Sequence, residues 1–318
     1  MKRLTQPADA EAANISFGIE IETKLPPSAN VAVGGYHSGL PVRAGRSSRT
    51  NGLVLAPTFH GATWRADRDG SIQCLPGEVA CEFVSPILKG ADGVTNLRDF
   101  VAWVNEIGAT VDESCGLHIT VGVASIIGTT DAGKVSEFAR KLAHICQWHA
   151  MSLYGQTGTG RHLNRYSAAF SAEVASHMKT IVRTSSIEQK RTAAVACGRG
   201  MINFQKLFTV GVIEFRVFAG TLSLPKIMHH LATVLGFCRR AHQVQCLGGF
   251  KKNSVQARRT VSAKEALKFL YNYLGWTGGA RPTALGMFGI LCSYFPTMRA
   301  EAVRLCQQFD ARFPEARL

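Results

Sequence analysis

The chain of 318 residues has no uninterrupted apolar run long enough to cross a membrane, which would need about 20 residues. Its first fourteen residues begin with basic side chains but lack the apolar segment of a secretory signal peptide. Nine cysteines are scattered without a Cys-x-x-Cys pair or the spacing of a zinc site. These absences predict a cytoplasmic protein with reduced thiols, although Cys74 and Cys81 are close enough in sequence to approach one another.

Several catalytic and binding motifs are also missing. The chain has no Gly-x-Ser-x-Gly nucleophile elbow, no aromatic ribonucleoprotein signature, no convincing helix-turn-helix and no repeat of solenoid period. The glycine-rich segment 155–160 lacks the Lys-Ser/Thr of a phosphate-binding P-loop, although it could carry Arg161 and Arg165 to an anionic ligand. A catalytic pair of Cys115 and His118 is conceivable, but nothing in the sequence marks the thiol as activated.

Acidic residues are scarce relative to basic ones. Asp and Glu number 22 against 36 Lys and Arg, and the net charge is +14. Such a balance predicts an acidic partner, which could be a nucleotide, a nucleic acid or another anionic polymer. A solvated basic surface explains the balance equally well, because the charge is spread over local clusters at 43–49, 239–240 and 251–259.

The composition is that of a folded protein, with 46% hydrophobic and 18% charged residues. Alternating apolar and polar residues predict strands, at 17–22, 79–84, 117–123 and 210–218. Apolar residues at helical spacing predict helices, at 93–107, 133–154 and 226–246. Asp92 is a suitable N-cap for the first helix and Gly108 a suitable stop. The strands suit antiparallel pairing, so we predict an α+β fold.

The organisation along the chain follows from these elements. We expect a mobile tail over 1–14 and a catalytic domain over 15–247. Residues 24–62 are rich in Gly, Pro, Ser and Asn, which predicts an insertion or a flap inside that domain. The remainder, 248–318, is predicted to be a basic linker followed by a helical C-terminal extension, with helices at 262–274, 283–294 and 297–311.

Each predicted strand carries ionisable side chains opposite an apolar row. In Phe-Gly-Ile-Glu-Ile-Glu, Ile19 and Ile21 face one way, and Glu20 and Glu22 the other. The two carboxylates lie about 7 Å apart, because a strand rises about 3.3 Å per residue. A solvated strand face shows the same pattern. The three other strands nevertheless carry matching groups: Glu82, His118, and Glu214 with Arg216.

If these strands form one sheet, their apolar rows pack on the helices 93–107 and 133–154, and their charged rows share a face. Four glutamates and one histidine suit Mg²⁺ or Mn²⁺ bridging to nucleotide phosphates. Arg216 would then neutralise charge that develops during phosphoryl transfer. Asp69-Gly70-Ser71 is a turn signal that could hold Asp69 at the mouth of the site.

Taken together, these segments resemble the amidoligase family, a branch of the glutamine synthetase-like carboxylate–amine ligases. The matching pieces occur in the family's order over about residues 15–225: FGIEIE, WRADRDGSI, EVACEFVSPIL, CGLHITV, Arg165-Tyr166, Asn203 and VIEFRVFAGTL. Thr120 departs from the family, which often has a second histidine there. The resemblance implies an antiparallel sheet shaped as a half-open funnel, with helices on its outer face and charged rows inside.

The resemblance also implies roles for individual residues. Glu20, Glu22, Glu82 and Glu214 resemble metal ligands, and His118 resembles a residue that contacts the metal or an ATP phosphate. Arg216 resembles an arginine that stabilises phosphoryl transfer, and Arg165 a residue that binds a carboxylate or a phosphate. Asp69 and Ser71 resemble a loop that receives the amine.

The sequence therefore predicts a ligase that uses ATP and Mg²⁺ or Mn²⁺ to join a small-molecule or peptide carboxylate to an amine through an acyl phosphate. Two alternatives remain at this stage. One is a basic protein that binds nucleic acid or another polyanion and has a degenerate site, and the other is a ligase acting on an anionic polymer.

Overall fold

A computed structural model describes residues 15–34, 41–43, 57–155, 157 and 160–245. The strands within these residues are β1 (Ser16–Leu25), β2 (Ala32–Gly34), β3 (Pro41–Arg43), β4 (Thr58–Phe59), β5 (Ala62–Thr63), β6 (Arg65–Asp67), β7 (Val79–Val84), β8 (Leu88–Lys89), β9 (Gly116–Gly122), β10 (Ile202–Asn203) and β11 (Val212–Ala219). The helices are α1 (Gly90–Glu106), α2 (Val123–Ile127), α3 (Ala132–Trp148), α4 (Ala150–Gly155), α5 (Ala172–Arg183), α6 (Ile187–Ala196) and α7 (Leu224–Gln243), with 3-10 turns η2 (Pro27–Ala29) and η3 (Gly160–Leu163).

Nine strands form one open sheet in the order β10-β11-β9-β1-β7-β6-β2-β3, with β8 paired to one end of β1. Within the described residues every pairing in it is antiparallel except that of β2 with β6. The predicted α+β class and antiparallel strands are confirmed, while the funnel shape stays a prediction. The predicted strand 79–84 is also confirmed, because β7 spans Val79–Val84. The Ser85 hydroxyl that follows it accepts the backbone N–H of Ile19 at 2.8 Å.

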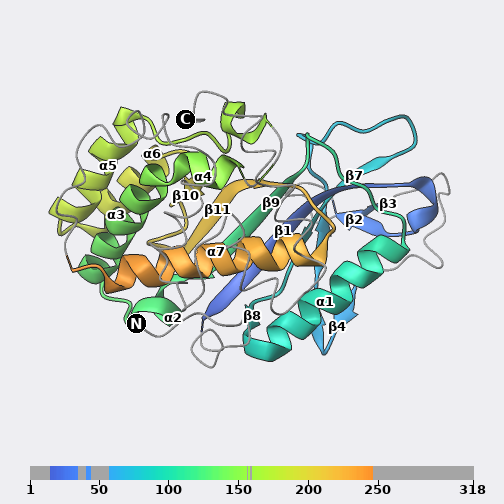
Figure 1. Cartoon of the computed structure of the whole chain (residues 1–318), viewed down its shortest axis with the longest axis horizontal. Coiled ribbons are helices and arrows are strands. Elements are labelled where there is room, and N and C mark those ends of the chain that lie inside the picture. Colours follow the sequence, from blue (N-terminus) through green and yellow to red (C-terminus); the bar gives the residue numbers. More distant parts are fainter. Residues whose placement is uncertain (1–14, 35–40, 44–56, 156, 158–159, 246–318) are drawn as a thin grey trace, which may run out of the picture.

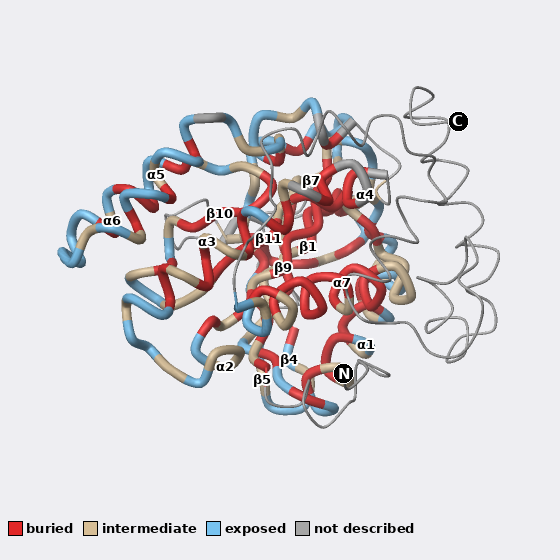
Figure 2. The backbone as a smooth tube through the Cα atoms, turned by 60° about the vertical axis from the view of Figure 1, so that its left-hand side comes forward, coloured by how far each residue is buried: buried red, intermediate tan, exposed pale blue. Residues whose placement is uncertain are grey.

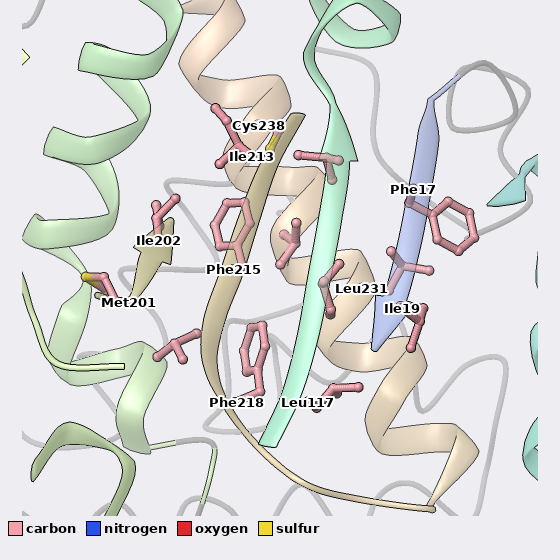
Figure 3. Close-up of a cluster of buried hydrophobic side chains, with 14 of the residues drawn as sticks. Phe17, Ile19, Leu117, Met201, Ile202, Ile213, Phe215, Phe218, Leu231 and Cys238 are labelled. Carbon is pink, nitrogen blue, oxygen red and sulfur yellow. The ribbon is translucent and has the colours of Figure 1, made fainter. Parts of the chain in front are cut away.

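The apolar face of the sheet packs on helices. The alternating residues Ile19, Ile21, Leu117 and Ile119 have no exposed surface. Side chains of α7 lie against this face over β9 and β11 (Figures 1 and 3). Helix α1 packs on β7, where the centroid of the Phe100 ring lies 5.3 Å from that of Phe83. Figure 2 shows that buried residues concentrate where these helices meet the sheet.

The helices depart from the sequence prediction in three ways. Helix α7, rather than the helix predicted at 133–154, covers the central strands, and α3 instead packs on α7 and α5. The predicted helix 133–154 is two helices, because α3 ends at Trp148 and His149 breaks the helical conformation before α4. Asp92 is not the N-cap of α1, which begins two residues earlier, so this carboxylate lies in the first turn. Gly108 follows the end of α1 at a φ of 76°, as predicted.

Strand β11 departs from the strict alternation that its sequence predicts. Phe215 lies opposite Ile119, but Phe218 lies opposite Leu117, so β11 has one more residue than β9 between these two pairs. This β-bulge turns Phe218 from the predicted charged face into the core. Its ring is fully buried and stacks on His230 of α7, with 4.2 Å between ring centroids (Figure 3).

Some parts of the predicted organisation are altered or lie outside the described residues. The 24–62 segment contributes β2 and β3 to the main sheet, in addition to the small β4–β5 hairpin. Helices α5 and α6 and strand β10 have no counterpart in the sequence prediction. The predicted tail over 1–14 and the C-terminal helices lie outside the described residues, and the domain boundaries stay predictions. No described helix is long and apolar enough to span a bilayer.

Candidate active site

The register of the sheet places ionisable side chains of neighbouring strands beside one another on the face opposite the core. Glu22 of β1 lies directly opposite Glu82 of β7, and Glu20 lies opposite His118 of β9. Directly opposed residues of antiparallel strands point to the same face, with Cβ atoms about 4.5–5.5 Å apart. Glu214 comes from β11, the next strand beyond β9. The structure thus brings together the four glutamates that the sequence suggests as ligands.

His118 lies at the centre of this cluster and is 1% exposed. Its Nδ1 atom lies 3.2 Å from a carboxylate oxygen of Glu20 and 3.5 Å from oxygens of Glu82 and Glu214. Its Nε2 atom lies 3.5 Å from Glu22 Oε1 and has no hydrogen-bond partner among the described residues. One imidazole therefore contacts carboxylates from three strands.

The charges of the cluster depend on one another. Burial and the Arg216 guanidinium lower the pKa of His118. Hydrogen bonds to Glu20 and Glu82 and the charge of Glu22 have a larger, opposite effect and raise the pKa to about 10. Burial raises the pKa of Glu20, whereas His118 lowers it more, to about 2. The pKa of Glu82 is raised, because burial and the neighbouring carboxylates outweigh His118. In the absence of a bound cation the imidazolium is thus a counter-charge for the carboxylates at neutral pH, and a cation that His118 ligates would replace its proton.

Two arginines complete the cationic side of the cluster. Arg216 forms an ion pair with Glu214, lies with Nη1 3.4 Å from His118 Nδ1, and donates from Nε to the Tyr166 carbonyl at 3.2 Å. Arg161 of η3 is 4% exposed and donates from Nη2 to the Arg216 carbonyl at 3.0 Å. The sequence pointed to Arg161 only through its glycine-rich loop, and the structure places it beside the catalytic candidates.

Gly116 at the start of β9 leaves room for these groups. Its N–H donates to Glu22 Oε2. A Cβ atom at this position would lie 2.8 Å from Arg161 Nη2 and 3.0 Å from His118 Nε2. Contacts that short require a neighbour to move, so glycine is needed for the observed packing of Glu22, His118 and Arg161.

The loop after β6 brings a fifth carboxylate to the cluster. Single ligand atoms of Asp69, Glu22 and Glu82 lie within 4.8 Å of one another. Asp69 Oδ1 also accepts the Ser71 N–H at 2.6 Å, which forms the predicted turn. Ser71 is exposed, and within the described part of the chain no contact joins its hydroxyl to the carboxylates, so only Asp69 of this predicted pair reaches the cluster.

Two site residues received no role from the sequence. Asn203 of β10 is buried and donates to Glu214 Oε2 at 2.8 Å, which orients that carboxylate. Asp67 of β6 lies directly opposite Glu82 in the sheet. Both belong to very short strands that give no periodic signal, although each falls within a segment that resembles the amidoligase family.

Arg165 and Cys115 lie outside the cluster. Arg165 is exposed, and its guanidinium lies 4.5 Å from the ring centroid of Tyr166. Cys115 is buried, and its Sγ approaches Asp112 Oδ1 at 3.8 Å rather than His118. Burial raises the pKa of this thiol to about 11, which disfavours the reactive thiolate. Cys74 and Cys81 are free thiols.

The donor set fits a divalent cation that prefers oxygen ligands. One group of candidate ligands is Glu20, Glu82 and His118, and a second is Glu22, Asp69 and Glu82. Carboxylates suit Mg²⁺ and Mn²⁺, and the buried Nε2 atom of His118 lacks a hydrogen-bond partner among the described residues. Glu82 is common to both groups, so it is the carboxylate that both candidate positions would share.

A cavity of about 420 Å³ opens beside the carboxylates. Its charged lining residues are Glu20, Glu214, Lys206 and Arg65, and Gly18 also lines it. Its remaining walls are mainly apolar and include Pro86, Ile87, Val210 and Val212. A cavity of this size suits a small ligand with one charged end and one apolar end.

A family model described as "Putative amidoligase enzyme" matches residues 13–238. The chain belongs to this family. The amidoligase match includes every residue of the carboxylate cluster and ends within α7. No curated protein sequence matches the chain.

Among solved structures, a bifunctional glutathione synthetase from Pasteurella multocida resembles this amidoligase family member with a TM-score of 0.40 and 12% sequence identity. The match covers 92% of this chain and 49% of the synthetase chain, so the chain spans about half the length of that protein.

Proposed function

We propose that the chain is an ATP-dependent carboxylate–amine ligase that forms an amide or isopeptide bond through an acyl phosphate. Its membership of the amidoligase family supports amide-bond formation. The observation that carries the proposal is the convergence of four carboxylates around one buried histidine, with Asp69 near two of them and Arg216 paired with Glu214. Such a site is suited to hold cations and phosphate oxygens together.

The reaction has two balanced steps. In the first, a carboxylate oxygen of the acid substrate attacks the γ-phosphorus of ATP, the bond from that phosphorus to the β,γ-bridging oxygen breaks, and ADP leaves. In the second, the amine nitrogen attacks the acyl carbon, the bond to the phosphate oxygen breaks, and inorganic phosphate leaves. The amine loses one proton, which a nearby carboxylate accepts.

The carboxylate cluster would hold the Mg²⁺ or Mn²⁺ ions. Glu20, Glu82 and His118 form one ligand group, and Glu22 and Asp69 complete the second with Glu82. A bound ion supplies charge neutralisation for the phosphate oxygens. The residues around it orient the ligands: Asn203 fixes Glu214, and the Gly116 N–H fixes Glu22.

Arg216 is our candidate for stabilising the transferred phosphoryl group. Burial lowers the pKa of its guanidinium, but Glu214, Glu22 and Glu20 together raise it more, so the side chain stays charged. The ion pair with Glu214 and the bond to the Tyr166 carbonyl hold the side chain in one orientation. A cation fixed before the reaction stabilises developing charge without reorganisation.

We assign the nucleotide to the 420 Å³ cavity. The cavity is lined by Glu20, a candidate cation ligand, and by Glu214, Lys206 supplies a positive charge, and the apolar lining residues can receive a base. Asp69, at the mouth of the site, is our candidate to accept the proton of the amine, because it belongs to the loop that reaches the cluster from outside the sheet.

The direct test is release of ADP from Mg·ATP by the full chain, with panels of acids and amines added singly and together. We expect release that requires both an acid and an amine. Glu82→Gln and Glu214→Gln should each lower the rate by about 10²–10³-fold, as loss of one group that stabilises transition-state charge commonly does. Glu188→Gln removes a carboxylate that is 73% exposed on α6 and is the matched control.

The alternative of a polyanion-binding protein predicts a different result. Binding of a nucleic acid would then fall steeply with salt, and neither Glu82→Gln nor Glu214→Gln would change it. Full ADP release by the two variants would overturn the assigned roles, and absence of acid- and amine-dependent release in the wild-type chain would overturn the ligase proposal.

A further inference from the structure

A second cavity, of about 710 Å³, shares no lining residue with the first. Two loops form it, 165–171 and 197–205. Its charged lining residues are Arg165 and Arg199, and Tyr166 and Gln205 are among its polar ones. Among the described residues, no acidic side chain lines it.

The two loops are held together and to the candidate active site. The Met201 N–H donates to the Ala168 carbonyl at 2.8 Å, and a Cβ at Gly200 would lie 3.1 Å from the same carbonyl oxygen. The Arg216 N–H donates to the Met201 carbonyl at 2.9 Å, while its side chain donates to the Tyr166 carbonyl at 3.2 Å. Arg216 therefore bonds to both loops. A second link runs from Gln205 of the cavity lining, whose N–H donates to Asn203 Oδ1 at 3.0 Å, and Asn203 donates to Glu214 of the carboxylate cluster at 2.8 Å.

The charge of the second cavity is not neutralised by the described part of the protein. Arg199 forms no ion pair with any described residue, and Arg165 contacts the ring and hydroxyl of Tyr166 rather than a carboxylate. Both side chains are exposed and so can reach a ligand. Guanidinium groups bind carboxylates and phosphates through paired hydrogen bonds, so two of them in one cavity favour an anionic ligand.

The rest of the lining is apolar or small. Phe170, Val174 and Cys197 provide carbon and sulfur surface, and Val174 and Cys197 are largely buried. Glu173, beside Val174 in α5, is exposed and does not line the cavity. A ligand that suits this lining has an aliphatic stem and an anionic end.

We propose that the second cavity binds the far end of the acid substrate, and that this substrate is a diacid: one carboxylate reacts at the cluster, and a second anionic group at the end of an aliphatic stem is held by Arg165 and Arg199. This inference rests on the proposed ligase function. It adds a substrate class and gives Arg199, which no motif marks, a role in specificity.

The test compares binding of matched acids to the full chain by isothermal titration. The probes are the straight-chain dicarboxylates from succinate to suberate, and the monocarboxylates of equal length. We expect at least one diacid to bind about tenfold or more tightly than its monoacid, because a charged hydrogen bond is added. Arg199→Gln and Arg165→Gln should remove that preference, while the control Arg183→Gln, at the exposed end of α5, retains it.

The outcomes separate this inference from the proposed function. Diacid binding that depends on Arg199, without ADP release in the presence of ATP and an amine panel, would leave the cavity assignment standing and remove the ligase. ADP release as fast with monoacids as with diacids, and unaffected by Arg199→Gln, would leave the ligase standing and overturn the cavity assignment. Three further results would overturn the cavity assignment. They are equal binding of diacids and monoacids, no binding of any diacid, and an effect of Arg199→Gln on ADP binding alone.

Discussion

The two faces of the central sheet are built from alternate residues of the same strands. One face is closely packed with apolar side chains, and the other gathers charged ones. On the helix-covered face, side chains such as Ile19, Ile119 and Phe215 are packed with almost no exposed surface, and their shapes must fit (Figure 3). On the opposite face, Glu20, Glu22, Glu82 and Glu214 crowd around His118. The first face gains free energy from burial. The second gathers like charges, which suggests that it is retained for binding rather than for stability.

Truncation on the packed face should give the largest effect on folding. Phe218→Ala should lower the free energy of unfolding by about 3–5 kcal/mol, because a fully buried ring is lost and a cavity is left. Urea denaturation of the full chain measures this change. The control is Val212→Ala, which removes methyl groups from a half-buried residue of the same strand.

The same variant tests the bulge in β11. With strict alternation, Phe218 would lie on the charged face, and its truncation would cost little. A loss below about 1 kcal/mol, the scale of an ordinary surface or partly buried change, would therefore contradict the bulged register of β11 against β9.

Added volume on the charged face should give the next largest effect. Gly116→Ala places a Cβ 2.8 Å from Arg161 Nη2 and 3.0 Å from Glu22 Oε2. We expect a loss of about 1–3 kcal/mol in unfolding free energy, as for other overpacked sites, together with reduced ADP release. Gly70→Ala is the stability control, because no atom of the described residues lies within 4 Å of its added Cβ. Equal stability of the two variants would show that the cluster can relax around a methyl group.

Much of this contrast was predictable from the sequence. Strands β1, β7 and β9 are long enough for alternation to show which residues share a face, so the glutamates and His118 could be grouped before their contacts were known. The bulge could not be predicted, because it depends on pairing with β9 rather than on any residue of β11. Nor could the two- and three-residue strands that carry Asp67 and Asn203, since such short segments have no period.

The helical predictions failed where tertiary contacts decide the outcome. The apolar stripe of 133–154 does not show that His149 interrupts it. A stripe also does not say which surface it meets, and α3 packs on other helices while α7 covers the sheet. The structure brings Asp69 of the predicted turn to the cluster and leaves Ser71 exposed, because a turn fixes the backbone and leaves the direction of the second side chain open.

Binding of Mg²⁺ should change the charged face without affecting the packed one. At a free concentration ten times its dissociation constant, an ion bound only by the folded state adds about 1.4 kcal/mol to the free energy of unfolding. Glu82→Gln should lose most of this gain, because Glu82 belongs to both candidate ligand groups. Thermal unfolding with Mg²⁺ or with a chelator measures the difference, and Glu188→Gln is the control. A gain that is the same in Glu82→Gln would place the ion elsewhere.

The smallest expected effect on stability is near the end of β1, where Lys24 forms an ion pair with Asp112. Burial raises the pKa of Asp112, but hydrogen bonds from Lys24 and Ser114 lower it more, to about 2. A carboxyl whose pKa is lower in the folded state stabilises the fold above its unfolded value, which is 3.8, and this contribution disappears as the pH falls toward 2. Because the Asp112 side chain is 42% exposed, solvent screening limits it to under about 1 kcal/mol.

Asp112→Asn should therefore be slightly less stable than the wild-type chain at pH 7, and the gap should close as the pH is lowered from 4 toward 2. Urea denaturation at pH 7 and pH 3 measures the gap, and Glu113→Gln, the exposed neighbour, should show none at either pH. Because the ion pair of Lys24 with Asp112 includes no carboxylate of the cluster, Asp112→Asn should leave the Mg²⁺ gain unchanged. If Asp112→Asn lowered both the stability at pH 7 and the gain from Mg²⁺, the pair of Lys24 and Asp112 would help to position Glu22. The two faces would then be less independent than the strand register suggests.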